Sequence, residues 1–141
     1  MDEKKVGNTA QIRFAQDIVI ANKNCILVRF GALELLFNKD NALDIVWANF
    51  KGVNLSFQSK NGLTSPQAYS AANGEFAEQW PGGMLVTCGL DNVGGHAKEG
   101  GEFPTHGRIS HVPAKNFGTD TFWDGDNYIL RAAGEVHQTK M

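Results

Sequence analysis

The chain has 141 residues and a mass of 15.4 kDa, which is the size of about one domain and excludes a multidomain protein. Hydrophobic residues make up 42% of it and charged residues 20%, and these ordinary fractions exclude a disordered, collagen-like or coiled-coil chain. Thirteen basic and fifteen acidic side chains give a net charge of -2, which argues against a nucleic-acid partner.

Two further features bear on the location of the protein. No apolar stretch approaches the roughly 18 residues that a membrane span needs, and no signal-peptide pattern follows Met1–Lys5. Cys25 and Cys88 lie far apart, and without a signal peptide we expect both to be reduced thiols. We therefore expect a cytoplasmic protein with no membrane partner.

The first half of the chain reads as short strands. Sixteen glycines and four prolines indicate many tight turns, which favour β structure. Ala10–Ile20 alternates with a period of two, which predicts a strand. Cys25–Phe30 and Leu33–Phe37 are β-prone runs separated by Gly31 and Ala32, and the second ends at the turn-rich Asn38–Asn41; this pattern predicts a hairpin.

Two alternating runs follow, Leu43–Trp47 and Val53–Phe57, and each predicts a strand with one buried and one wet face. From Ser59 to Asn73 the chain is polar and turn-rich, and loops of this length are often functional. Asn73–Trp80 predicts a short helix that has Asn73 as its N-cap and Phe76 and Trp80 on its apolar face.

The second half combines loops with strands. We expect Pro81–Gly83 to end the helix, Met84–Cys88 to form an apolar strand, and a long loop to run from Gly89 to Pro104. Asp124–Asn127 has the composition of a hairpin turn, after which a last strand runs to the C-terminus. The pattern predicts an all-β fold, an antiparallel β-sandwich in a single domain over residues 1–141.

The segment Thr105–His111 offers the clearest candidate for chemistry. If it is extended, His106, Arg108 and Ser110 share one face and form a wall of hydrogen-bond donors. Such a wall suits a ligand covered in hydroxyl groups, because the arginine fork donates while histidine and serine both donate and accept. The alternative is an ordinary solvated face on which Arg108 forms an ion pair.

Other kinds of site find less support. The four histidines do not have the spacing of zinc ligands, and Asp124 and Asp126 lack the further acidic ligands of a calcium loop. The glycines of the long loop do not form a phosphate-binding motif. We read Cys88 as a core residue and the aromatic side chains as core or sugar-stacking groups. We expect no metal ion and no cofactor.

Several motifs occur in an order that resembles one family, the aldose 1-epimerase-related proteins of the galactose mutarotase-like superfamily. The likeness runs from about Gly31 to the C-terminus, and its motifs are Asn41–Ile45, Phe50–Gly52, Ser65–Pro66, Gly82–Gly94, Thr105–Ser110 and Val112–Ala114. The resemblance implies a large antiparallel β-sandwich, a supersandwich, that binds a sugar in a groove across one sheet.

The resemblance also implies site residues. His106 is similar to the histidine that contacts sugar hydroxyls near the anomeric centre, Arg108 lines the same site, and Asn92 belongs to the accompanying glycine-rich motif; these three are the expected substrate-binding residues. Two positions depart from the family pattern. Asn41–Ala42 replaces an Arg-Gly pair, which removes a charge, and Thr105 replaces a leucine.

Mutarotation needs a general base and a general acid, and in the superfamily these are a glutamate and a second histidine downstream of the His-Gly motif. We therefore expect the acid and base to lie outside this chain, which resembles the N-terminal half of such a protein, and we expect the chain alone to be inactive. The predicted function is that of a carbohydrate-binding, aldose 1-epimerase-like protein. The alternative is a non-catalytic carbohydrate-binding β-sandwich. The expected partners are a small sugar and either a second copy, in a homodimer, or the missing half.

Overall fold

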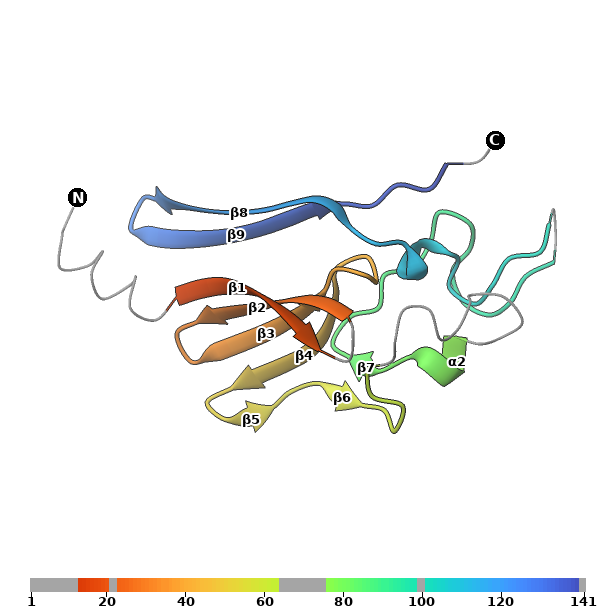
Figure 1. The fold of residues 1–141 in the computed structure, drawn as a ribbon, viewed down its shortest axis with the longest axis horizontal. Coiled ribbons are helices and arrows are strands. Elements are labelled where there is room, and N and C mark those ends of the chain that lie inside the picture. The colour runs from red at the N-terminus through yellow and green to blue at the C-terminus, as the bar shows by residue number, and fades with distance from the viewer. Residues whose placement is uncertain (1–12, 21–22, 64–75, 99–100, 140–141) are drawn as a thin grey trace.

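The computed structural model describes residues 13–20, 23–63, 76–98 and 101–139 (Figure 1). Within these residues the largest unit is a five-stranded sheet in the order β1-β2-β3-β4-β5, in which each strand pairs antiparallel with the next in sequence. The strands are β1 (Arg13–Ile20), β2 (Lys23–Phe30), β3 (Leu33–Asn38), β4 (Asp44–Phe50) and β5 (Val53–Asn54). The predicted first strand and the predicted hairpin are both confirmed.

Apolar residues are buried on both faces of this sheet: Ile26, Val28 and Ala48 on one face, and the packed cluster of the core on the other. Cys25, Leu36 and Val46 are buried there, and Leu27, Trp47 and Leu63 pack against them. Leu36 lies opposite Trp47 whereas Phe37 lies opposite Ile45, so Val46 is an extra residue that forms a β-bulge. The bulge lets both Val46 and Trp47 reach the core.

The bulge also changes which residues of β4 are buried. The sequence pattern predicts an apolar face and a wet face over Leu43–Trp47, but the buried residues of the strand are Asp44, Val46 and Ala48. Asp44 tolerates burial because its Oδ1 accepts a hydrogen bond from the backbone N–H of Thr87 at 2.6 Å. The expected assignment of the two faces is therefore wrong for β4.

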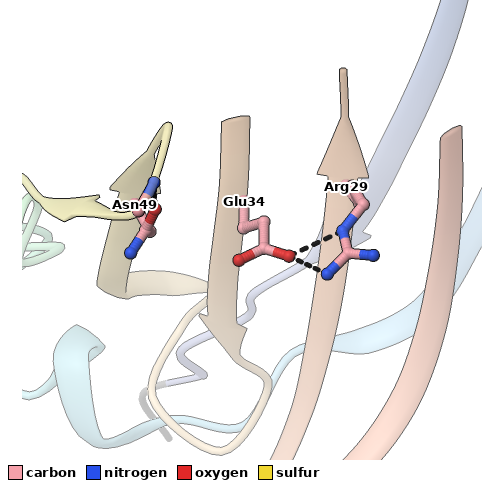
Figure 2. A network of polar contacts seen from close by, with 4 residues as sticks. Arg29, Glu34 and Asn49 are labelled. Atoms are coloured by element: carbon pink, nitrogen blue, oxygen red, sulfur yellow. Dashed lines mark hydrogen bonds and ion pairs between the residues drawn. The ribbon is translucent and has the colours of Figure 1, made fainter. Parts of the chain in front are cut away.

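A polar row crosses the sheet at one end. Arg29, Glu34 and Asn49 lie opposite one another on β2, β3 and β4 (Figure 2). The Nε of Arg29 donates to Oε1 of Glu34 at 2.6 Å, and its Nη2 contacts the same oxygen. Such cross-strand pairs fix the register of neighbouring strands.

The run Val53–Phe57 does not form the strand that its alternation predicts. It is divided between β5 and the two-residue strand β6 (Phe57–Gln58), and its apolar side chains at 53, 55 and 57 are 62%, 50% and 60% exposed. The Asn54 side chain accepts from the backbone N–H of Ser56 at 3.1 Å and donates to its carbonyl at 2.8 Å, which ends β5. The predicted buried apolar face is wrong here, and the buried residue of the run is Ser56.

The next segment contains α2 (Phe76–Gln79) and β7 (Gly82–Gly83), which pairs with β6. The predicted helix and the contact across its face are confirmed, since the rings of Phe76 and Trp80 stack at 6.2 Å. The proposed N-cap, Asn73, lies outside the described residues. The predicted strand Met84–Cys88 is wrong: the chain there is irregular, and both Met84 and Leu85 are exposed.

The C-terminal part is a long hairpin of β8 (Lys115–Asp124) and β9 (Asn127–Glu135), seen as a two-stranded arm in Figure 1. Gly125 and Asp126 form its turn, which confirms the predicted signal, while the last strand ends at Glu135. Neither strand contains a buried residue. The base of the arm is joined to the turn after β3, where the N–H of Ala114 donates to the carbonyl of Lys39 at 2.7 Å.

All named strand pairs of the described residues are antiparallel, so the predicted all-β fold is confirmed. None of the helices that the structure describes is both long and apolar enough to cross a bilayer.

Candidate functional site

The segment that carries most of the expected chemistry is a turn and not a strand. Thr105 and His106 form the turn, and a 3-10 helix follows at Ile109–His111. His106 and Gly107 both have left-handed backbones, with φ of 64° and 78°. The expected wall is therefore wrong, because this conformation turns the chain, and Ser110 is buried and bonded to Nδ1 of His111.

The turn instead packs against a second segment, residues 89–95, which we call the glycine loop. The N–H of Gly89 donates to the carbonyl of His106 at 3.0 Å, and the N–H of His106 donates to the carbonyl of Gly94 at 2.8 Å. A Cβ on Gly107 would lie 2.5 Å from the carbonyl oxygen of Gly89. Only glycine permits this approach, which joins the two motifs backbone to backbone.

The ring of His106 is held on two sides. Its Nδ1 accepts a hydrogen bond from the N–H of Gly94 at 3.3 Å, and its ring lies edge-on to Phe76 with a centroid separation of 5.0 Å. Because Nδ1 accepts, the neutral ring carries its proton on Nε2. His106 is thereby oriented as a hydrogen-bond donor.

Phe76 belongs to a row of aromatic rings that leads to this histidine. Phe57 stacks on Trp80 at 5.5 Å, and Trp80 stacks on Phe76. The row starts at an exposed ring and ends at His106. It adds apolar surface beside the polar groups of the turn.

Arg108 leaves the turn beside the glycine loop. Its Nε lies 3.8 Å from Oδ2 of Asp91, and its Nη2 donates to the carbonyl of Glu102 at 3.3 Å. The same Asp91 oxygen accepts a hydrogen bond from Nε2 of Gln138 at 2.8 Å. The Asp91 side chain is 0% exposed and that of Arg108 is 47% exposed, so a buried carboxylate faces a half-exposed guanidinium.

Asn92, the third expected substrate-binding residue, holds the glycine loop together. Its Nδ2 donates to the carbonyl of Gly95 at 3.2 Å, and its Oδ1 is buried with no hydrogen-bond partner in the part of the chain that the structure describes. The structure thus places His106, Arg108 and Asn92 on two segments that pack together.

A small cavity of about 20 Å³ is lined in part by Phe76. Asn38, Asn41, Asp44, Trp80 and His111 are among its lining residues. The Nε1 of Trp80 is buried and has no hydrogen-bond partner among the described residues. The volume is that of about one water molecule, so it does not hold a sugar.

Asn41 and Ala42, which stand where the family that the sequence resembles has an Arg-Gly pair, both form hydrogen bonds to the segment around the 3-10 helix. Nδ2 of Asn41 donates to the carbonyl of Ser110 at 2.7 Å, and the N–H of Ala42 donates to the carbonyl of Val112 at 3.0 Å. Ala42 is buried with a left-handed φ of 49°. Asn41 therefore joins the turn after β3 to the 3-10 helix.

Both cysteines are free, which agrees with the expected reduced thiols, but Cys88 is exposed. Its expected place in the core is wrong, because the segment before the glycine loop is not a strand. Among the described residues no three histidine, cysteine, aspartate or glutamate side chains are grouped as metal ligands.

The sequence did not single out two members of the site. Asp91 stands within the glycine-rich motif, where a carboxylate beside Asn92 could have drawn attention to it. Gln138 carries no signal, because its contact with Asp91 spans 47 residues. The roles of both residues in the site follow from the way in which the loops pack together in the structure.

A family model matches residues 23–141, and its description is Domain of unknown function (DUF4432). The chain belongs to the DUF4432 family. The DUF4432 region includes the five-stranded sheet from β2 onward, the glycine loop and the turn with His106. No curated protein and no solved structure matches the chain.

Proposed function

We propose that this DUF4432 chain is a carbohydrate-binding, aldose 1-epimerase-like protein that acts at the anomeric centre of a free sugar or sugar derivative. One observation carries the proposal: the two most specific motifs of the resemblance, the glycine loop and the turn at His106, pack into one unit through their backbones. On this proposal the antiparallel sheets belong to a mutarotase-like β-sandwich.

The chemistry of the unit supports a ligand rich in hydroxyl groups. Nε2 of His106 is a donor in the neutral ring, and the guanidinium of Arg108 offers a fork of donors at a half-exposed position. Sugar hydroxyls accept from both groups. The ring of Phe76 beside His106 offers an apolar surface to the C–H groups of a sugar.

The glutamates at 99, 102 and 135 are the obvious candidates within the chain for the catalytic base, but we do not assign that role to them. Glu102 lies 3.7 Å from Nε2 of His96, and Glu135 bonds to Asn116 and His137, so both carboxylates have partners away from His106. Glu99 lies outside the described residues. On this proposal the 141 residues orient the sugar, and a glutamate and a second histidine from a downstream segment transfer the protons.

A non-catalytic carbohydrate-binding protein is the second candidate, and Asn41 favours it. The aldose 1-epimerase-related proteins that the sequence resembles have an arginine at this position, whereas the Asn41 side chain here is bonded to the backbone of Ser110. A site that keeps His106 and Arg108 but lacks the positive charge of the replaced arginine would bind a sugar without interconverting its anomers. Activity of the chain together with the downstream segment separates the two candidates.

Titration of the isotopically labelled chain with aldoses, followed by chemical-shift mapping, tests the binding site. We expect shifts at His106, Arg108 and the glycine loop. His106→Asn should weaken binding about tenfold or more while keeping the left-handed turn, which asparagine tolerates. Asp120→Asn, on the distant hairpin, is the matched control. Shifts that avoid the two motifs would refute the proposed site.

Polarimetry on freshly dissolved sugars tests the catalytic part of the proposal. We expect no acceleration by the 141-residue chain and acceleration when the downstream half is added, because each positioned acid or base contributes about 100- to 10,000-fold. Mutarotation by the chain alone, abolished in His106→Asn, would mean that it contains its own catalytic pair.

We also propose that the chain works as a homodimer or in a complex with its downstream half. The exposed apolar side chains of the Val53–Phe57 run, together with a hairpin arm that buries no residue, support this proposal. Light scattering at micromolar concentration should show association, weakened in Leu55→Lys. A clean monomer with a cooperative melt would contradict it.

A further inference from the structure

The carboxylate of Asp91 is the most deeply buried charged group beside the proposed sugar site. Its side chain is 0% exposed, and Nε of Arg108 lies 3.8 Å from its Oδ2. A carboxylate removed from water keeps its charge only when a cation or several donors compensate it. Arg108 is a cation that the structure places beside it.

Gln138 holds this carboxylate from the other end of the chain. Its Nε2 donates to the same oxygen, Oδ2 of Asp91, at 2.8 Å. The segment that follows β9 is therefore seated on the glycine loop. The hydrogen bond from Gln138 restrains the carboxylate on the side away from the arginine's own backbone segment, because Gln138 lies on a different part of the chain.

The guanidinium of Arg108 is held at a second point as well. Its Nη2 donates to the carbonyl of Glu102 at 3.3 Å. The hydrogen bond at Nη2 and the ion pair at Nε together restrain the guanidinium, because the group is rigid. Nη1 has no partner among the residues that the structure describes, and the side chain is 47% exposed.

We propose that Asp91 is a positioning residue: it holds the guanidinium of Arg108 so that Nη1 presents its donors to a ligand hydroxyl, while Gln138 holds Asp91. The inference rests on the proposed sugar site for its ligand. It gives Asp91 a role that the family resemblance does not imply. Preorganised donors bind more tightly, since less freedom is lost when the ligand arrives.

The first test needs no ligand. In the NMR spectrum of the full chain, the Nε–H signal of Arg108, assigned by its loss in Arg108→Gln, should be shifted from that of a free arginine. Asp91→Asn keeps an acceptor for Gln138 but removes the charge, and it should move this signal toward that of a free arginine. Asp120→Asn, which removes the partner of Arg131 on the hairpin, should leave the Arg108 signal unchanged. An Arg108 signal unaffected by Asp91→Asn would overturn the inference.

The second test uses the sugar titration in a double-mutant cycle. Asp91→Asn should weaken binding about tenfold in the wild-type background and less than about twofold in Arg108→Gln, because Asp91 acts through Arg108. An equal loss in both backgrounds would point to a merely structural role and refute positioning. If no sugar binds the wild type but the Arg108 signal responds as expected, the proposed function fails and the positioning of Arg108 stands.

Discussion

A single methyl group at residue 107 should separate the two motifs of the candidate site. A Cβ there would lie 2.5 Å from the carbonyl oxygen of Gly89 and 3.1 Å from that of Asn92. Both neighbours are backbone atoms, so neither can rotate away. Gly107 also has a φ of 78°, which alanine adopts only with strain.

The magnitude follows from these two terms. The left-handed backbone costs an alanine about 1–2 kcal/mol, and forcing an atom into packed surroundings costs about 1–3 kcal/mol more. Gly107→Ala should therefore lower the free energy of unfolding by about 2–5 kcal/mol. Gly94→Ala is the matched control in the same loop: its φ is 94° and no atom lies within 4 Å of the added Cβ, so only the strain of about 1–2 kcal/mol applies.

Thermal unfolding followed by tryptophan fluorescence measures both variants. At roughly 4 °C per kcal/mol for a domain of this size, we expect the melting temperature to fall by roughly 8–20 °C in Gly107→Ala and by roughly 4–8 °C in Gly94→Ala. Equal destabilisation by the two substitutions would refute the reasoning, because it would mean that the close approach of residues 89 and 107 contributes nothing.

Three other features give direct predictions. The hydrogen bonds from Asn116 and His137 hold the pKa of Glu135 below its ordinary value of 4.5, so their contribution is present above that pH and is lost as the pH falls through the lowered pKa; a carbon-13 titration should show this, and Asn116→Ala should return the pKa toward 4.5. A maleimide should label Cys88 in the native protein but Cys25, which is 0% exposed, only after unfolding; equal rates would contradict this placement. Ala42→Gly should raise the free energy of unfolding by about 0.5–1 kcal/mol, because glycine relieves a φ of 49°, and an unchanged urea midpoint would count against that strain.

The elements that the sequence predicts correctly are those with local signals. Gly31 and the Asp124–Asn127 turn are read from a few adjacent residues, and each hairpin forms where its turn predicts it. The Val53–Phe57 run fails because its alternation does not tell whether anything covers the apolar face. A short-range contact, between Asn54 and Ser56, then decides the backbone.

The candidate site illustrates the other limit of sequence reasoning. The residue pattern and the resemblance both predict His106 and Arg108, and the resemblance alone predicts Asn92. The extended wall is wrong because the left-handed backbone of His106 is bonded to Gly94 across the loops. Gln138 could not be found at all, since nothing near it in sequence marks its bond to Asp91. The sequence indicates which residue types belong to the site, but the arrangement of their side chains depends on contacts between segments that are far apart in the sequence.

Val46 is the one residue of β4 with no partner opposite it in β3. Deleting it would leave Trp47 opposite Leu36 and Ile45 opposite Phe37, so Asp44 would still face Thr87. Deleting a paired residue such as Ala48 would instead move every following side chain to the other face of the sheet. Length variation in this strand should therefore be tolerated at the bulge before any other position, at the cost of one buried side chain, about 1.5–3 kcal/mol.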